Sequence, residues 1–129
     1  MTGKPGSEVN TDAIQAAAQQ DRAIFSARMA GTSLEAAVDI WLKRVARRKV
    51  SAAARARLVK AVEKATAAET RDVQLTRAAL LRAAGLDERP AAAAAVAAGA
   101  TYAEVGEVLG MTQQGASKRV RSFVDGPTR

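Results

Sequence analysis

Side chains that can read the edges of nucleic-acid bases gather near the C-terminal end of the chain. A glutamine amide can pair with N6 and N7 of adenine, and a lysine or arginine can donate to O6 and N7 of guanine. No acidic residue lies between Thr112 and Ser122. We therefore expect a helix over residues 112–124 to enter the major groove of DNA and to face the bases with Gln113, Gln114, Ser117, Lys118 and Arg121.

A second group of residues around this segment can hold phosphate groups. Hydroxyls, backbone amides at a helix start and cationic side chains all bind phosphate oxygens. Such contacts fix a protein on the duplex without reading its sequence. The candidates for these contacts are Thr101, Tyr102, Thr112 and Arg119.

Two short helices joined by a tight turn are needed to position these side chains, and the sequence predicts both. Thr101 and Glu104 have the spacing of a capping box, so the first helix should begin at Tyr102. Gly110 suits the left-handed conformation that ends such a helix. Thr112 is a favourable N-cap for the second helix.

The spacing of apolar residues predicts one buried face on each of the two helices. Apolar residues recur there three and four positions apart. They are Val105, Val108 and Leu109 in the first helix, and Ala116, Val120 and Phe123 or Val124 in the second. Small residues at Ala103, Gly106 and Ala116 should let the two helices approach closely.

This segment resembles the helix-turn-helix heads of DNA-binding proteins. It is similar over residues 88–124 to the C-terminal heads of small regulators from high-GC bacteria, phages and plasmids, and to the region-four head of sigma factors. The matching positions are Thr101, Glu104, Gly110, Thr112 and Arg119. Ala116 is smaller than the valine or isoleucine common at its position, so the packing should be looser. The resemblance implies a three-helix head, over residues 87–124, that binds DNA.

The sequence also predicts a further helix directly upstream of these two. Gly85 followed by Leu86 has the pattern of a Schellman motif, which ends a helix. Asp87 can cap the next helix, with Pro90 in its first turn. Gly99 should end that helix. It would be the first of the three helices.

An ordinary packing role competes with this interpretation. Two capped amphipathic helices can be a simple all-α packing unit, and a basic helix without acids can be a solvated face. The sequence leaves this alternative open. The turn residues and the asymmetric charge favour DNA binding.

Residues 11–86 are predicted to be a helical region that mediates oligomerisation. A helix over residues 12–30 should end at Gly31, and Ser33 should cap the next helix. The fold expected for the chain is therefore all-α, with an N-terminal helical bundle followed by the three-helix head. Residues 1–10 are expected to form a disordered arm, and residues 125–129 a frayed tail.

Two further helix starts are expected between residues 51 and 86. Ser51 can cap a third helix. Thr66 and Glu69 have the spacing of a second capping box, ahead of a helix over residues 69–84.

The clearest apolar stripe in the chain surrounds its single tryptophan. Trp41 and Leu42 lie on the helix expected after Ser33, at spacings of three and four from other apolar residues. We interpret Trp41 as a core or dimer contact. The helix that carries it is expected to form a homodimer or higher oligomer through Val38, Trp41, Leu42 and Val45.

A run of basic residues uninterrupted by acids is a second candidate DNA surface. It could bind phosphates and raise affinity without adding sequence information. A solvated helical face is the alternative that the sequence leaves open. The candidate residues are Lys43, Arg44, Arg47, Arg48, Lys49, Arg55 and Arg57, with Lys60 at the end of the run.

Composition narrows the classes of function. The chain has 129 residues and a net charge of +7, which makes a polyanion a natural partner. It has no cysteine and no histidine, so thiol chemistry and the commonest general base and metal ligand are missing. We expect neither an enzyme nor a bound metal or cofactor. No apolar run has membrane-spanning length, and the expected location is the cytoplasm, associated with the nucleoid.

Three functions remain open at this point. The first is a sequence-specific regulator of transcription, most simply a repressor, that binds double-stranded DNA as a dimer. The second is an architectural or partition protein that binds DNA through the basic run. The third is a helical adaptor for a protein partner such as RNA polymerase.

Overall fold

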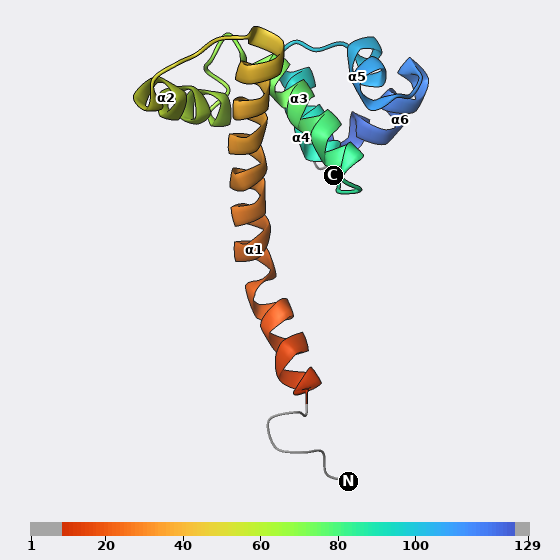
Figure 1. Cartoon of the computed structure of the whole chain (residues 1–129). Coiled ribbons are helices and arrows are strands. Elements are labelled where there is room, and N and C mark those ends of the chain that lie inside the picture. The colour runs from red at the N-terminus through yellow and green to blue at the C-terminus, as the bar shows by residue number, and fades with distance from the viewer. Residues whose placement is uncertain (1–8, 126–129) are drawn as a thin grey trace. The chain divides into compact units, whose positions relative to one another are not determined.

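The computed structural model describes residues 9–125, and all the regular structure in this range is helical (Figure 1). The predicted all-α class is therefore confirmed. The elements are α1 (Thr11–Ile40), the π-helix η1 (Trp41–Ala46), α2 (Ala52–Glu63), α3 (Thr70–Ala83), α4 (Arg89–Ala97), α5 (Tyr102–Leu109) and α6 (Gln113–Val124). No helix in this range is both long enough and apolar enough to span a membrane.

Asn10 was expected to belong to a disordered arm, but its side chain contacts the start of α1. Asn10 Oδ1 accepts a hydrogen bond from the backbone amide of Ala13 at 2.9 Å, so Asn10 caps the helix. The rest of the predicted arm, residues 1–8, lies outside the described residues, as do residues 126–129 of the predicted tail.

Helix α1 continues through Gly31, where the sequence predicted a break. A glycine inside a helix costs about 1 kcal/mol relative to alanine, which good helix formers on either side can offset. Ser33 lies within the helix rather than capping a new one, and its Oγ accepts a hydrogen bond from Nε of Arg77 at 2.8 Å. The two predicted helices are therefore one.

The chain divides into two compact units, Met1–Gly31 and Thr32–Arg129. In the first unit every residue from Thr11 to Gly31 is exposed. The second unit contains two clusters of buried apolar side chains. Helix α3 contributes to both clusters.

One of these two clusters surrounds the tryptophan, and we call it the first core. Trp41 and Leu42 are each 6% exposed and Val38 is fully buried, so all three are core residues of the single chain. Of the predicted roles, core or dimer contact, their burial within the chain agrees with the first. Val45 is 62% exposed and belongs to no core. The buried members of the first core are Leu34, Ala37, Val38, Trp41, Leu42, Val62 and Val73.

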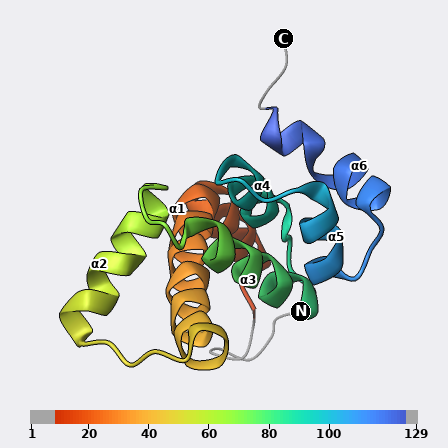
Figure 2. The ribbon, with the colours of Figure 1, turned by 90° about the horizontal axis from the view of Figure 1, so that it is seen from above.

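The second core joins α3 to the last three helices. Figure 2 shows α3 between α2 and α5, and α3 contacts both of these helices as well as α4. Most of the buried side chains of the second core are alanines, which allow helices to approach closely but bury little area each. The buried members of the second core are Ala78, Ala91, Ala92, Ala95, Ala100, Val105, Leu109, Ala116 and Val120.

The segment between α2 and α3 differs from its prediction. Thr66 Oγ1 donates to the carbonyl of Ala61 at 3.2 Å, and Ala65 has a positive φ of 60°. These features end α2 instead of starting the next helix. Glu69 has no capping partner in the predicted box, and its carboxylate pairs with Arg48 at 3.3 Å.

The predicted end of α3 is confirmed. Gly85 has a φ of 77°, and the amide of Leu86 donates to the carbonyl of Leu81 at 2.8 Å, as in a Schellman motif. Asp87 Oδ1 then accepts from the amide of Arg89 at 3.1 Å, at the start of α4.

Candidate nucleic-acid interface

The turn between α5 and α6 has the backbone conformation that its sequence predicted. Both hydrogen bonds of the capping box are present, from Glu104 N to Thr101 Oγ1 at 3.0 Å and from Thr101 N to Glu104 Oε1 at 2.9 Å. Gly110 is left-handed, with a φ of 73°. Thr112 Oγ1 accepts from the amide of Gly115 at 3.0 Å and caps α6.

A close backbone contact at Gly106 fixes the angle at which the chain leaves α5. The amide of Met111 donates to the carbonyl of Gly106 at 2.9 Å. A Cβ atom on Gly106 would lie 2.6 Å from the carbonyl oxygen of Met111 and 3.0 Å from that of Thr112. The predicted close approach therefore depends on Gly106, whereas Ala103 is exposed and takes no part in it.

Helix α6 has one buried face that holds it on the second core. Ala116 and Val120 are fully buried, and Val124, partly buried, packs against the same core. Phe123 is 40% exposed, and the guanidinium of Arg89 lies 4.8 Å from the centre of its ring. Of the two residues predicted to complete the apolar stripe, Val124 does so.

The opposite face of α6 carries the predicted base-reading side chains. Gln114, Ser117, Lys118 and Arg121 follow the spacing i, i+3, i+4, i+7, which places them on one side of the helix. All four line a shallow surface hollow that also includes Ser122 and Asp125. Arg121 Nη2 donates to Ser117 Oγ at 2.8 Å, and Gln113 is exposed at the start of the helix.

The three predicted phosphate-binding hydroxyls lie at or near the N-termini of α5 and α6. Thr101 and Thr112 are exposed, and their hydroxyl oxygens accept the capping hydrogen bonds. A hydroxyl that accepts a hydrogen bond can still donate its proton, so both remain able to donate to a phosphate. Tyr102 is half-buried and packs against the second core.

Arg119 has a different partner from the one that the sequence suggested. Its Nε and Nη2 atoms both donate to the carboxylate of Glu88, the latter to Oε1 at 3.1 Å. This bidentate ion pair joins α6 to the start of α4. Arg119 therefore stabilises the fold, and its role as a phosphate contact stays a prediction.

Glu88 is a buried ion-pair residue that sequence reasoning missed. Its side chain is only 1% exposed, and Arg82 Nη1 lies 3.5 Å from Oε2 as a second cationic partner. The hydrogen bonds from Arg119 hold the pKa of this carboxyl below its ordinary value, despite the opposing effect of burial. Thirty-one positions separate Glu88 from Arg119, so no local pattern could have indicated the pair.

The predicted second DNA surface surrounds the π-helix and the loop that follows it. Arg47 ends η1 in a left-handed conformation, with a φ of 53°, and donates its amide to the carbonyl of Leu42. Residues 48–50 then lead to Ser51, which caps α2 by accepting from the amide of Ala54 at 3.1 Å. The loop thus brings basic residues of η1, of the loop and of α2 around one hollow.

Two of the predicted basic residues are neutralised within the chain. Arg55 donates to both carboxylate oxygens of Asp39, at 2.5 and 3.0 Å, and this contact lowers the pKa of Asp39. Arg48 pairs with Glu69, and its guanidinium lies 5.0 Å from the centre of the Trp41 ring. The remaining six have no ion pair within residues 9–125: Lys43, Arg44, Arg47, Lys49, Arg57 and Lys60.

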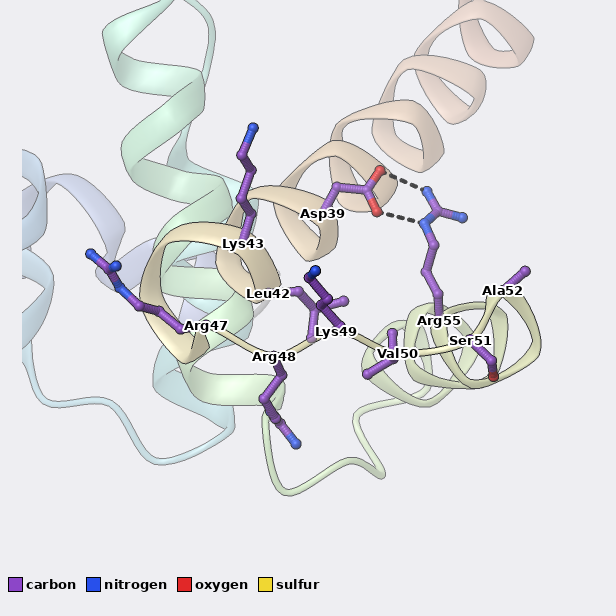
Figure 3. A pocket seen from close by; sticks show the side chains of 10 residues that line it. All are labelled: Asp39, Leu42, Lys43, Arg47, Arg48, Lys49, Val50, Ser51, Ala52 and Arg55. Atoms are coloured by element: carbon purple, nitrogen blue, oxygen red, sulfur yellow. Dashed lines mark hydrogen bonds and ion pairs between the residues drawn. The ribbon is translucent and has the colours of Figure 1, made fainter.

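The free cations around this hollow do not converge on one point. Figure 3 shows the unpaired Lys43 and Arg47 pointing in different directions, while Arg55 turns toward Asp39. This spread suits a diffuse positive surface better than a pocket for a single small anion. Among residues 9–125, no group of three or more acidic side chains is arranged to hold a metal ion.

Comparisons with protein-family models, with curated proteins and with solved structures found no match to the chain.

Proposed function

We propose that the chain is a sequence-specific DNA-binding protein and regulates transcription, with α4, α5 and α6 as a helix-turn-helix head. In this proposal α6 enters the major groove. Its outer face reads base edges through Gln114, Lys118 and Arg121, with Gln113 and Ser117 beside them.

The single observation that carries the proposal is the division of α6 into two faces. Ala116 and Val120 hold one face rigidly on the second core. The other face presents amide, hydroxyl and cationic groups, and Lys118 and Arg121 make no ion pair within residues 9–125. A helix held in this way can be inserted into the groove without reorganising.

The helix starts supply the positioning contacts in this proposal. Thr101 and Thr112 donate their hydroxyl protons to phosphates, and the positive ends of the α5 and α6 dipoles favour the same anions. Arg119 acts indirectly, because its ion pair with Glu88 fixes α6 relative to α4. One head reads only a few base pairs, so the functional form is a dimer on a two-fold site.

Selection from random duplexes tests the proposal. The chain is incubated with a pool of random duplexes at about 150 mM salt, near physiological ionic strength, and the retained DNA is sequenced. We expect a defined motif with two-fold symmetry. Retention without any motif, or no retention, would contradict sequence-specific binding.

Two variants then locate the reading surface. Gln114→Ala and Lys118→Ala should each weaken binding to the selected site by about 1–3 kcal/mol, with unchanged helix content by circular dichroism. Lys64→Ala removes the same charge from an exposed position at the end of α2 and is the matched control. If both α6 variants bind like the control, α6 does not read DNA.

A non-specific DNA-binding role is a second candidate that one observation favours. Lys43, Arg47 and Lys49 are free of ion pairs within residues 9–125 and spread around the loop after η1, as expected for a surface that follows many phosphates. An architectural protein that acts through this surface would bind selected and random duplexes equally well. The random-duplex experiment therefore distinguishes the two candidates.

A further inference from the structure

The first unit carries large apolar side chains that are exposed on a single helix. Ile24 is 58% exposed and Phe25 is 62% exposed, on a stretch of α1 in which every residue is exposed. Helices in proteins gain most of their stability from packing an apolar face against a partner. Two large apolar residues side by side on such a helix mark an interaction surface.

The residues that flank this apolar pair are charged and opposite in sign. Asp21, Ile24, Phe25 and Arg28 follow the spacing i, i+3, i+4, i+7 and so lie on one face of α1, which we call the Asp21–Arg28 face. Neither Asp21 nor Arg28 makes an ion pair within residues 9–125. The face therefore has an apolar centre, a negative end and a positive end.

This arrangement is self-complementary when two copies meet in antiparallel orientation. A two-fold axis between Ile24 and Phe25 brings Asp21 of one copy opposite Arg28 of the other, and the reverse pair forms at the same time. Ile24 and Phe25 of the two copies then meet at the axis. In a parallel pair in register, Asp21 would face Asp21 and Arg28 would face Arg28, and such like-charge pairs are destabilising.

Small residues continue the same symmetry at both ends of the face. Ala18 lies six residues before Ile24 and Gly31 six after Phe25, while Ala17 and Thr32 occupy the next equivalent positions. Small side chains at these positions let two helices approach closely. A shallow hollow borders this face, and its lining residues are Ala17, Ala18, Gln19, Asp21, Arg22 and Phe25.

We infer that the chain forms an antiparallel homodimer through the Asp21–Arg28 face of α1. An interface of this kind obeys the rule for two-fold dimers, in which the same patch is used on both subunits. The interface lies outside both cores and needs no DNA. It therefore stands or falls independently of the proposed function, although it would supply the dimer that a two-fold DNA site requires.

Sedimentation of the full chain without DNA, over a range of concentrations, tests this inference. The wild type should show a reversible monomer–dimer equilibrium. Phe25→Glu should raise the dimer dissociation constant at least about tenfold, because a residue at the centre of an interface dominates its energy. Leu86→Glu, at a position that is 59% exposed between α3 and α4, is the matched control and should leave the equilibrium unchanged.

Charge reversal tests the pairing of the two copies. Asp21→Arg and Arg28→Asp should each weaken the dimer, because each single change places like charges opposite one another. The double variant D21R/R28D should dimerise again, and an equal mixture of the two single variants should form heterodimers. Circular dichroism of each variant checks that α1 stays helical.

Disulfide trapping tests the antiparallel orientation. The chain has no cysteine of its own, and Ala17→Cys and Thr32→Cys introduce one each at opposite ends of the face. On oxidation the mixed variants should cross-link, because the symmetry brings these positions within disulfide range, while neither variant should cross-link with itself. A monomeric wild type, a Phe25→Glu variant that dimerises normally, or self-linked Ala17→Cys would overturn the inference.

Discussion

At the scale of single residues, Gly106 controls the geometry of the candidate interface. Gly106 lies inside α5, so a left-handed φ is not the reason that a glycine is needed there. Its missing side chain leaves room for the backbone carbonyls of Met111 and Thr112. Backbone atoms held by their own hydrogen bonds cannot move aside easily, so the turn depends on this position more than on any exposed residue nearby.

We predict that Gly106→Ala destabilises the protein although alanine is the better helix former. The gain in helix propensity is about 1 kcal/mol, but forcing a Cβ to within 2.6 Å of a carbonyl oxygen costs more. The net loss in the free energy of unfolding should be about 1–3 kcal/mol. Denaturant unfolding followed by the fluorescence of the single tryptophan, Trp41, measures it.

Gly31→Ala is the matched control for this prediction. A Cβ on Gly31 meets no atom within 4 Å, and the residue lies inside α1. Alanine there should leave the stability unchanged or raise it. Equal effects of the two substitutions would show that the close approach at Gly106 is not limiting.

At the scale of elements, the ion pair of Glu88 and Arg119 clamps α6 to the start of α4. Because the second core consists largely of alanines, its helices have few large side chains to hold them in register. A buried carboxylate with two guanidinium partners supplies a directional contact instead. We expect this contact to set the angle at which the outer face of α6 is presented.

Replacing Glu88 with glutamine should lower the stability and change its dependence on pH. The variant leaves Arg119 without its charged partner, which should cost about 1–3 kcal/mol at pH 7. The folded-state pKa of Glu88 lies below the ordinary value of 4.5. The stabilisation is therefore complete above that value, and it disappears as the pH falls through the folded-state pKa.

The free energies of unfolding of the wild type and of Glu88→Gln should thus approach each other as the pH falls below 4.5. Denaturant unfolding at pH 7, 5 and 3 measures the difference in free energy at each pH. Glu107→Gln, an exposed acid on α5, is the control and should differ little from the wild type at any of them. A constant difference for Glu88→Gln across this range would argue against a charged pair.

At the scale of the whole molecule, positive charge is concentrated on two surfaces with different character. The outer face of α6 combines cations with amides that can distinguish bases. The loop after η1 presents cations without such groups, and they point in different directions. The first surface is suited to specificity, and the second to affinity that depends on salt.

We predict that the triple variant Lys43→Ala/Arg47→Ala/Lys49→Ala binds DNA with a weaker dependence on salt. The slope of log K against log salt concentration is negative. Its magnitude should decrease by about 0.9 for every phosphate that the variant no longer neutralises. Gln114→Ala is the comparison, because it should reduce specific affinity and leave the slope unchanged. Titrations at several salt concentrations give both slopes, and an unchanged slope for the triple variant would exclude the loop from DNA.

Local signals in the sequence predicted the parts of the fold that depend on a few neighbouring residues. The capping box at Thr101, the left-handed Gly110 and the cap at Thr112 are all confirmed. Each depends on hydrogen bonds between residues no more than five apart, so residue type and spacing are sufficient. The spacing along α6 likewise placed Gln114, Ser117, Lys118 and Arg121 on one face.

The errors arose where a local signal competed with longer-range packing. Gly31 is a weak helix former, but the helix continues on both sides of it, so the residue does not end α1. Thr66 and Glu69 have the spacing of a capping box. In the structure, however, Thr66 hydrogen-bonds to the end of α2, and Glu69 pairs with Arg48. Apolar periodicity marked Trp41 and Leu42 as buried without showing whether the same chain or a second copy buries them.

The sequence by itself determined that this chain is helical, where several of its helices begin and end, and which face of α6 is polar. These properties follow from backbone hydrogen bonding and side-chain spacing within a few residues. Only the tertiary structure decided that α3 joins two cores, that Trp41 lies inside one of them and that Arg119 pairs with Glu88. Contacts between residues far apart in the chain depend on how whole helices pack, and no short pattern encodes that packing.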